Sequence, residues 1–143
     1  RSFADFARER MRAGWKPSAT PPEELALQPH CHEYSAFGHA VQKQVFEQWG
    51  VSKITQSTSC CGLAGNFGIE AEHYETSMKV AEHSMGKMLH EASPCASVAT
   101  DGFSCVTQLA HLEPGRKGSH LVELLDPAGD KNGARGSRDG KDA

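Results

Sequence analysis

Cysteines are the residues of this chain whose type and spacing point most directly to chemistry. The 143 residues contain five of them: Cys31, the adjacent pair Cys60 and Cys61, Cys95 and Cys105. An odd number that includes an adjacent pair is a poor disulfide framework. A trans peptide also holds neighbouring cysteines too close for ordinary disulfide geometry. We therefore expect reduced thiols that bind a metal or take part in redox chemistry.

The residues after the double cysteine favour an anionic centre. Gly62, Gly65 and Gly68 follow at every third position. Glycine lets the backbone approach closely, so that peptide N–H groups can point at negatively charged sulfur. The start of the helix expected over about 70–91 would add to this positive field. A bulky anionic centre suits such a loop better than a lone zinc ion.

The elements that must position these thiols alternate between strand and helix. We predict strands over 25–28, 51–55 and 96–100 from their apolar and β-branched residues, and helices over 3–11, 35–49, 70–91, 103–112 and 119–125. This alternation is typical of an α/β fold, here a Rossmann-like three-layer fold with a small, mainly parallel sheet and flanking helices. Cys31, Cys60, Cys61 and Cys105 follow the three strand ends. They should therefore converge at the carboxyl edge of the sheet.

Three kinds of chemistry suit four convergent thiols. An iron–sulfur cluster is held by cysteine sulfur. Zinc takes tetrahedral sulfur and nitrogen ligands, and His30 or His32 lies beside Cys31 to supply the nitrogen. A redox dithiol is the third, with Cys105 near a helix start as the candidate low-pKa thiol, although the usual Cys-x-x-Cys spacing is absent. Cys95 fits no motif and is interpreted as a structural thiol.

Composition limits the class of protein. Lys and Arg number 15 against 18 Asp and Glu, a net charge of −3 that gives little support to nucleic-acid binding. Without a long apolar run or a signal-peptide pattern, we expect a soluble cytoplasmic protein. Residues 1–23 are interpreted as an N-terminal helix and linker, 24–125 as the cysteine-rich domain and 126–143 as a disordered tail. Because three strands make a thin sheet and the chain starts at Arg1, we expect a fragment whose further strands come from upstream or from a partner.

Three motifs together resemble a known family. They are Pro29-His30-Cys31-His32, the run from Cys60-Cys61-Gly62 to Gly68, and Asp101-Gly102-Phe103-Ser104-Cys105. In this order they resemble the cysteine-rich CCG domain of heterodisulfide reductases and of the iron–sulfur subunits of glycolate oxidase and anaerobic glycerol-3-phosphate dehydrogenase. The helix residues Ser77-Met78-Lys79 and the Gly-Phe-Ser-Cys ending look most like the fused FAD-linked 2-hydroxyacid dehydrogenases, of the D-lactate or D-2-hydroxyglutarate type.

The resemblance implies a ligand set and partners. Cys31, Cys60, Cys61 and Cys105 would ligate an iron–sulfur cluster, of the 4Fe–4S type, with Gly62, Gly65, Gly68 and His32 around it. FAD would sit on another domain or subunit, and electrons would pass onward to an acceptor such as a quinone, with partners able to hold the protein at the inner membrane. The wider family has Cys-x-x-Cys in its last motif, whereas this chain has Gly102, so one ligand is missing. Some similar domains hold zinc, which keeps a zinc-binding structural or docking module as the alternative.

Overall fold

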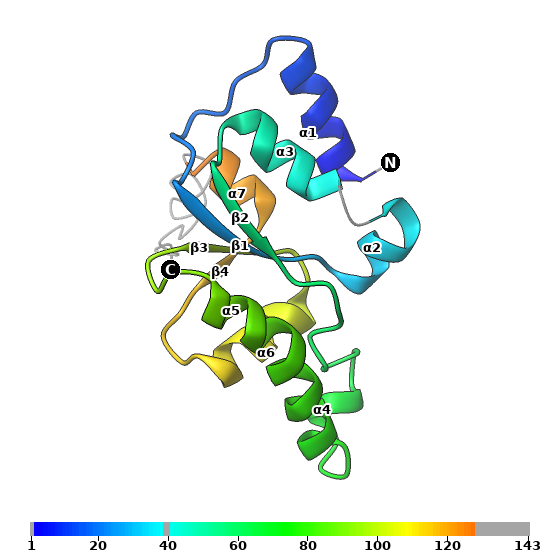
Figure 1. The fold of residues 1–143 in the computed structure, drawn as a ribbon. Coiled ribbons are helices and arrows are strands. Elements are labelled where there is room, and N and C mark those ends of the chain that lie inside the picture. Colours follow the sequence, from blue (N-terminus) through cyan, green and yellow to red (C-terminus); the bar gives the residue numbers. More distant parts are fainter. Residues whose placement is uncertain (1, 39–40, 128–143) are drawn as a thin grey trace, which may run out of the picture.

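The computed structural model describes residues 2–38 and 41–127 of the chain (Figure 1). In chain order its elements are α1 (Phe3–Arg12), β1 (Glu24–Gln28), α2 (Cys31–Phe37), α3 (Val41–Trp49), β2 (Lys53–Gln56), η1 (Phe67–Ile69), α4 (Tyr74–Ala81), η2 (Glu82–Gly86), α5 (Lys87–Glu91), β3 (Ser97–Thr100), α6 (Phe103–Leu112), β4 (Gly118–Ser119) and α7 (Leu121–Leu125). Most of the tail predicted over 126–143 lies outside the described residues.

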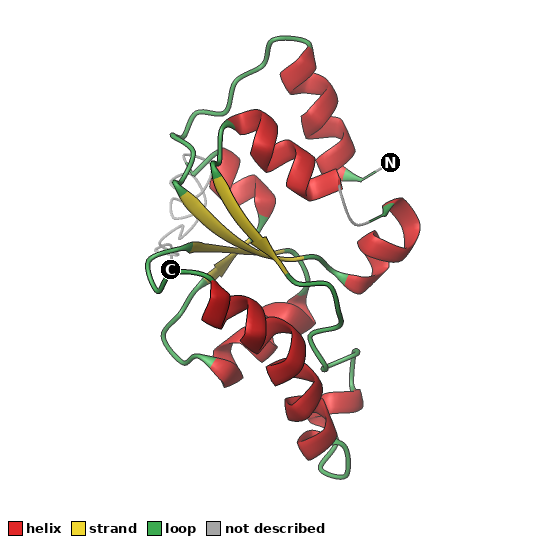
Figure 2. Ribbon diagram, in the orientation of Figure 1, coloured by secondary structure: helices red, strands yellow, loops and turns green. Residues whose placement is uncertain are grey.

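One parallel sheet organises the molecule, with strand order β2-β1-β3-β4 and helices on both faces (Figure 2). This confirms the expected α/β, Rossmann-like three-layer fold. The strand order reverses between β1 and β3, and in doubly wound sheets the crevice beyond the carboxyl ends at such a point is the usual ligand site. The sequence did not predict β4, because two small residues, Gly118 and Ser119, carry no apolar pattern. In the described residues, the additional strand therefore comes from the chain itself.

The alternation of side chains along the strands builds two cores. Leu25 and Leu27 are fully buried on one face, beneath α1, α3 and α7. Ala26 and Val98 point to the opposite face, which η2, α5 and α6 cover. Burying one leucine contributes roughly 2 kcal/mol, so this two-sided pattern fixes the register strongly. Ala4 and Ala7 of α1 belong to the first core, which ties the N-terminal helix to the same fold.

Two helix predictions need correction. The helix expected over 35–49 is two helices, because α2 begins at Cys31 and ends at Gly38, whose φ of 88° favours glycine. The helix expected over 70–91 begins only at Tyr74, and between α4 and α5 it contains the π-helical turn η2. None of the helices in the described stretches has the length and apolar character that crossing a bilayer requires.

Candidate metal centre

The structure brings Cys31, Cys60, Cys61 and Cys105 together at the carboxyl edge of the sheet. Cys31 is the first residue of α2, just after β1, and Cys105 lies in the first turn of α6, just after β3. Cys60 and Cys61 lie in the loop that follows β2. The thiols of Cys31 and Cys60 interact, as do those of Cys60 and Cys61 and those of Cys61 and Cys105. These contacts form a chain that runs from an exposed thiol, Cys31, to a buried one, Cys105.

The loop after Cys60 turns its backbone amides toward the sulfurs. Gly62 has a φ of 89°, and a Cβ on it would lie 2.4 Å from the Ser77 carbonyl oxygen, so only glycine fits. Its N–H donates to Cys60 Sγ at 3.3 Å. The N–H groups of Leu63 and Ala64 act on Cys61 in the same way. Successive N–H groups in such a turn form a concave anion site, which suits thiolates or a negatively charged centre.

The other two glycines of the motif have different roles from the one expected. The N–H of Gly68 donates to the Leu63 carbonyl at 2.8 Å, and a Cβ there would collide with Ser77 Oγ. Gly68 therefore lets the loop pack against α4. Gly65 adopts a φ of 67° at an exposed position, with no atom within 4 Å of a built Cβ. Leu63 and Ala64, which the sequence did not single out, are the donors to Cys61.

Burial and mutual contact separate the pKa values of the thiols. A hydrogen bond from the Cys105 thiol lowers the pKa of Cys61 to about 6, and the N–H groups of Leu63 and Ala64 act in the same direction. The same pairing, together with burial, raises the pKa of Cys105. Burial raises the pKa of Cys60 to about 11. The low-pKa thiol is therefore Cys61, and the expectation that it would be Cys105 is wrong, because Cys105 gives the proton in this pair.

Polar side chains tie the loop of the double cysteine to its neighbours. Gln28, the last residue of β1, is fully buried and donates through Nε2 to the carbonyls of Pro29 and Ser59. Ser84 lies in the π-helical turn η2, and its hydroxyl donates to the Cys60 carbonyl. Such π-helical turns frequently mark functional sites because they re-aim a side chain. Gln28 and Ser84 thus fix Cys60 from the sheet and from the helix layer.

Thr100 places a hydroxyl beneath Cys105. It is the last residue of β3, opposite Gln28 in the sheet register, and only 1% of its surface is exposed. Its Oγ1 has no well-formed hydrogen bond, yet it faces the Cys105 thiol closely enough to lower that thiol's pKa. Buried hydroxyls rarely remain unpartnered, so this one is available to a thiolate. Sequence inspection missed Thr100 and Gln28, and the one signal for them was a polar residue at the end of an otherwise apolar strand.

The His30 ring occupies the space beside Gly102. A Cβ built on Gly102 would lie 2.1 Å from Cδ2 of the His30 ring, so the imidazole already fills that space. His30 also accepts a hydrogen bond from the His32 N–H through Nδ1 at 3.3 Å and so caps α2. One ring therefore contacts both the helix that carries Cys31 and the turn that precedes Cys105.

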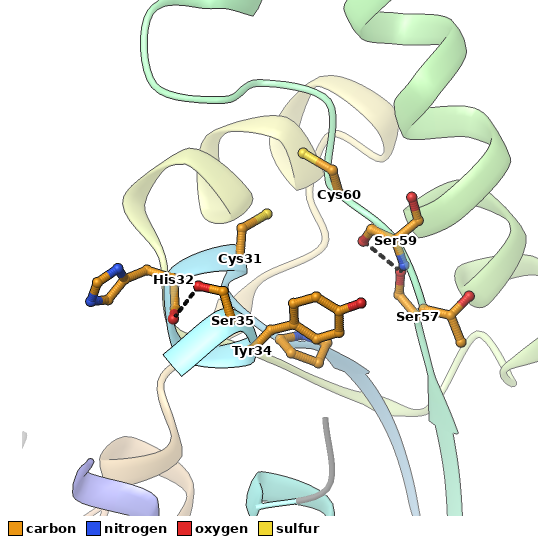
Figure 3. Close-up of a pocket in the computed structure, with 9 residues that line it drawn as sticks. Cys31, His32, Tyr34, Ser35, Ser57, Ser59 and Cys60 are labelled. Atoms are coloured by element: carbon orange, nitrogen blue, oxygen red, sulfur yellow. Dashed lines mark hydrogen bonds between the residues drawn. The ribbon is translucent and has the colours of Figure 1, made fainter. Parts of the chain in front are cut away.

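Two cavities lie at the carboxyl edge of the sheet, and thiols line the first of them. The first, of about 510 Å³, lies between α2 and the loop after β2, and Cys31 and Cys60 point toward one another beside it (Figure 3). The second, of about 430 Å³, lies among α1, α2 and the turn after β3 and includes Glu33 and Asp101. His32 contributes to both walls, but its imidazole points away from the two thiols.

The described thiols contact one another rather than surround a common point. In the described residues, no three side chains of His, Cys, Asp or Glu are placed to hold one metal ion as they stand. The chemistry of the donor set still fits a sulfur-ligated centre, with four thiols, inward N–H groups and an unpartnered hydroxyl. Cys95 lies apart from this group, at the amino end of β3, and is exposed rather than buried.

The sequence is similar to bacterial D-2-hydroxyglutarate dehydrogenases. It is 32% identical over 107 residues to the enzyme of Pseudomonas putida. The matched segment makes up 73% of this chain and 10% of that protein. It is 32% identical over 98 residues to that of Escherichia coli, covering 67% of this chain and 9% of the enzyme. It is 31% identical over 109 residues to the enzyme of Pantoea ananatis, and this match covers 75% of the present chain and 11% of that enzyme.

The chain therefore spans about a tenth of the length of the curated relatives it matches. No known protein-family profile matches it, and no solved structure gives a match. Its homologues are dehydrogenases, and the similarity is consistent with a domain of such an oxidoreductase.

Proposed function

We propose that this chain is the iron–sulfur electron-transfer domain of a FAD-dependent 2-hydroxyacid dehydrogenase. The observation that carries the proposal is the continuous contact among Cys31, Cys60, Cys61 and Cys105 at the carboxyl edge of the sheet. The dehydrogenase homologues support the class of reaction. FAD and the hydroxyacid site would belong to another domain or subunit, because the described residues contain no nucleotide-binding glycine motif.

The residues around the thiols are suited to hold negative charge. Four thiolates would be the ligands, and the N–H groups of Gly62, Leu63 and Ala64 offset their charge. The hydroxyl of Thr100 offers one more donor, at Cys105. When bound, a cluster of this kind supplies one-electron transfer, with a potential set by such hydrogen bonds and by solvent exposure.

The chain of contacts suits several metal atoms better than one. A single zinc ion needs all its sulfur ligands at about 2.3 Å from one point, whereas the thiolates of a four-iron cluster bind different irons. In either case the thiols must rotate away from one another to admit the centre. Because ligands must also lose their protons, loading should release protons and stabilise the fold.

A zinc-stabilised docking module without a redox role is the second candidate. Four sulfur ligands satisfy tetrahedral zinc as well. A histidine ligand has less support, because His30 Nδ1 already accepts the His32 N–H, and the His32 ring points away from Cys31. An all-sulfur site is therefore the zinc arrangement that the structure favours.

Anaerobic loading separates the two candidates. The chain is purified without oxygen and offered iron with sulfide, or zinc alone, and metal and sulfide are then analysed. We expect a brown protein with about four irons per chain and a paramagnetic signal on reduction. A colourless protein that keeps one equivalent of zinc and rejects iron would establish the docking module instead. Metal-free protein with one reactive thiol would contradict both and favour a thiol–disulfide role.

A further inference from the structure

The four thiols at the carboxyl edge divide into an accessible pair and a buried pair. Cys31 is exposed and Cys60 is half-buried, and their thiols point toward one another beside the cavity of about 510 Å³ (Figure 3). The other pair is enclosed, with only 2% of Cys61 and 1% of Cys105 exposed. Because thiol–disulfide exchange requires direct access to sulfur, a reagent from solution reaches the first pair and not the second.

The two backbones that carry the accessible pair are held with unequal firmness. The loop at Cys60 is fixed, because Gln28 donates to the neighbouring Ser59 carbonyl and Ser84 donates to the carbonyl of Cys60 itself. Cys31 begins α2, a helix in which no residue is buried. A helix without buried side chains can shift at little cost in packing. Small movements of α2 can therefore bring the Cys31 sulfur within bonding distance of Cys60.

The buried pair lacks this freedom. Both Cys61 and Cys105 belong to the core on the face of the sheet that η2, α5 and α6 cover. Protein interiors are close-packed, so a shift of either backbone would disturb that core. A bond between the adjacent Cys60 and Cys61 is disfavoured as well, because a trans peptide holds their α-carbons too close together for ordinary disulfide geometry. Access and freedom of movement both favour the pairing of Cys31 with Cys60.

We propose that Cys31 and Cys60 form a site of reversible oxidation, at which the metal-free chain closes a disulfide with a low-molecular-weight disulfide as the oxidant. The Cys31 sulfur attacks one sulfur of the reagent, whose S–S bond breaks and releases one thiol. The Cys60 sulfur then attacks the Cys31 sulfur of this mixed disulfide and releases the second thiol. The two protons of the protein thiols leave on the released thiols, so the chain loses two electrons and the reagent gains them.

The cavity beside the pair suits an uncharged reagent. Its described walls contain no Lys, Arg, Asp or Glu, so they hold no charge that would select an ionic one. Closing the pair would occupy two of the four thiols proposed as metal ligands, and reduction would return them. The inference concerns the chain before any centre is bound, and it therefore does not depend on the proposed function.

The test uses the full chain, purified metal-free and without oxygen, and treats it with hydroxyethyl disulfide, a small neutral disulfide. We expect the chain to lose two of its five free thiols and about 2 Da of mass, and dithiothreitol to reverse both changes. Trypsin cleaves after Lys43 and Lys79. Cys31, the double cysteine and Cys105 therefore lie in three different peptides, and peptide mapping shows which of them are joined.

Single variants identify the bonded sulfur within the double cysteine. Cys60→Ser should abolish the crosslink and leave a lasting mixed disulfide on Cys31, whereas Cys61→Ser should keep the crosslink. Cys31→Ser should abolish it as well. Cys95→Ser replaces an exposed cysteine at the other edge of the sheet and is the matched control, in which the crosslink should form as in the unaltered chain.

Three results would overturn the inference and leave the proposed function intact. They are a crosslink between the double cysteine and Cys105, a lasting adduct on Cys31 in the unaltered chain, and five thiols that do not react. Failure of the reduced chain to take up iron or zinc has the opposite meaning, since it would remove the proposed function and leave the oxidation of this pair standing.

Discussion

The amino and carboxyl edges of the sheet differ in how completely their polar groups are hydrogen-bonded. At the amino edge, Arg116 donates to the carbonyls of Ser93 and Ala96 and pairs with Glu113, and the Glu24 carboxylate accepts the Ser93 N–H. At the carboxyl edge, Gln28 Oε1, Gln42 Oε1 and Thr100 Oγ1 are buried without a hydrogen-bond partner, three of the four such atoms in the described residues. The polar groups named at the amino edge are paired, whereas these three buried oxygens at the carboxyl edge are not.

The two edges therefore contribute differently to the stability of the fold. Unpaired buried polar groups cost about 1–3 kcal/mol each, so they persist only where something else requires them. At the carboxyl edge, Thr100 lies against the Cys105 thiol, and Gln28 binds the Ser59 carbonyl next to Cys60. Burial there also raises the pKa of Glu33, whose carboxyl shares the Gln42 amide with Asp101. The amino edge is thus the better hydrogen-bonded of the two, and the unpaired groups at the carboxyl edge are what the proposed centre would use.

The largest difference in metal affinity should be between two single variants, each of which replaces one cysteine at one edge of the sheet. Cys61→Ser removes a buried thiol from the carboxyl edge, and Cys95→Ser changes an exposed thiol at the amino edge. We expect Cys61→Ser to lower metal affinity by more than about 100-fold, beyond the range of changes around ligands, and to abolish the rise in melting temperature on loading. Metal analysis and thermal unfolding check this. Equal metal content in the two variants would contradict the assignment of the centre.

The contact between Gly102 and His30 should have the next largest effect. Gly102→Ala forces a Cβ into the imidazole ring and should cost about 1–3 kcal/mol of unfolding free energy. Gly86→Ala is the matched control, since its nearest atom lies 3.5 Å away. His30→Ala added to Gly102→Ala should restore part of the loss, because the clash is gone. Urea unfolding measures all three, and a double variant as unstable as Gly102→Ala would show that the ring is not the cause.

Thr100→Val should separate stability from function at the carboxyl edge. The change keeps the shape of the side chain and removes an unpartnered hydroxyl, so the metal-free chain should gain about 1 kcal/mol. In the loaded chain, loss of the O–H donor near Cys105 should lower the reduction potential of the centre, and Thr100→Ser should leave it nearly unchanged. Denaturant unfolding and a redox titration test the two halves. An unaltered potential in Thr100→Val would show that the hydroxyl does not reach the centre.

The smallest effect concerns pH at the amino edge. The hydrogen bond from the Ser93 N–H holds the pKa of Glu24 below its ordinary value of 4.5. The stability it contributes is therefore complete above pH 4.5 and is lost as the pH falls through the lower, folded-state pKa. Glu24→Gln should flatten the loss of stability in this acidic range and leave metal binding unchanged. Unfolding curves measured at a series of acidic pH values check this, and an identical slope in both proteins would contradict it.

Local patterns in the sequence were sufficient for much of the fold. The apolar residues of 25–28 and 96–100 predicted β1 and β3, and the helix predicted over 3–11 is α1, at whose start Ser2 Oγ accepts the Asp5 N–H. The break at Gly38, the π-helical turn η2 and the two-residue β4 were not predicted. Each depends on packing against distant segments, for which a short window of sequence carries no signal.

Residue order was enough to predict that the cysteines follow strand ends, because the rules of parallel connections place those ends at one edge of the sheet. The differences among the thiols became visible only in the folded chain. It shows which thiols are buried and that Cys61 rather than Cys105 has the lowered pKa. It also shows that Gln28, Ser84 and Thr100 lie against the loop and the thiols. The physical reason is that burial and hydrogen bonding depend on which side chains meet across the sheet. Gly102 illustrates this dependence, because only the fold shows that the His30 ring fills the space a side chain there would need.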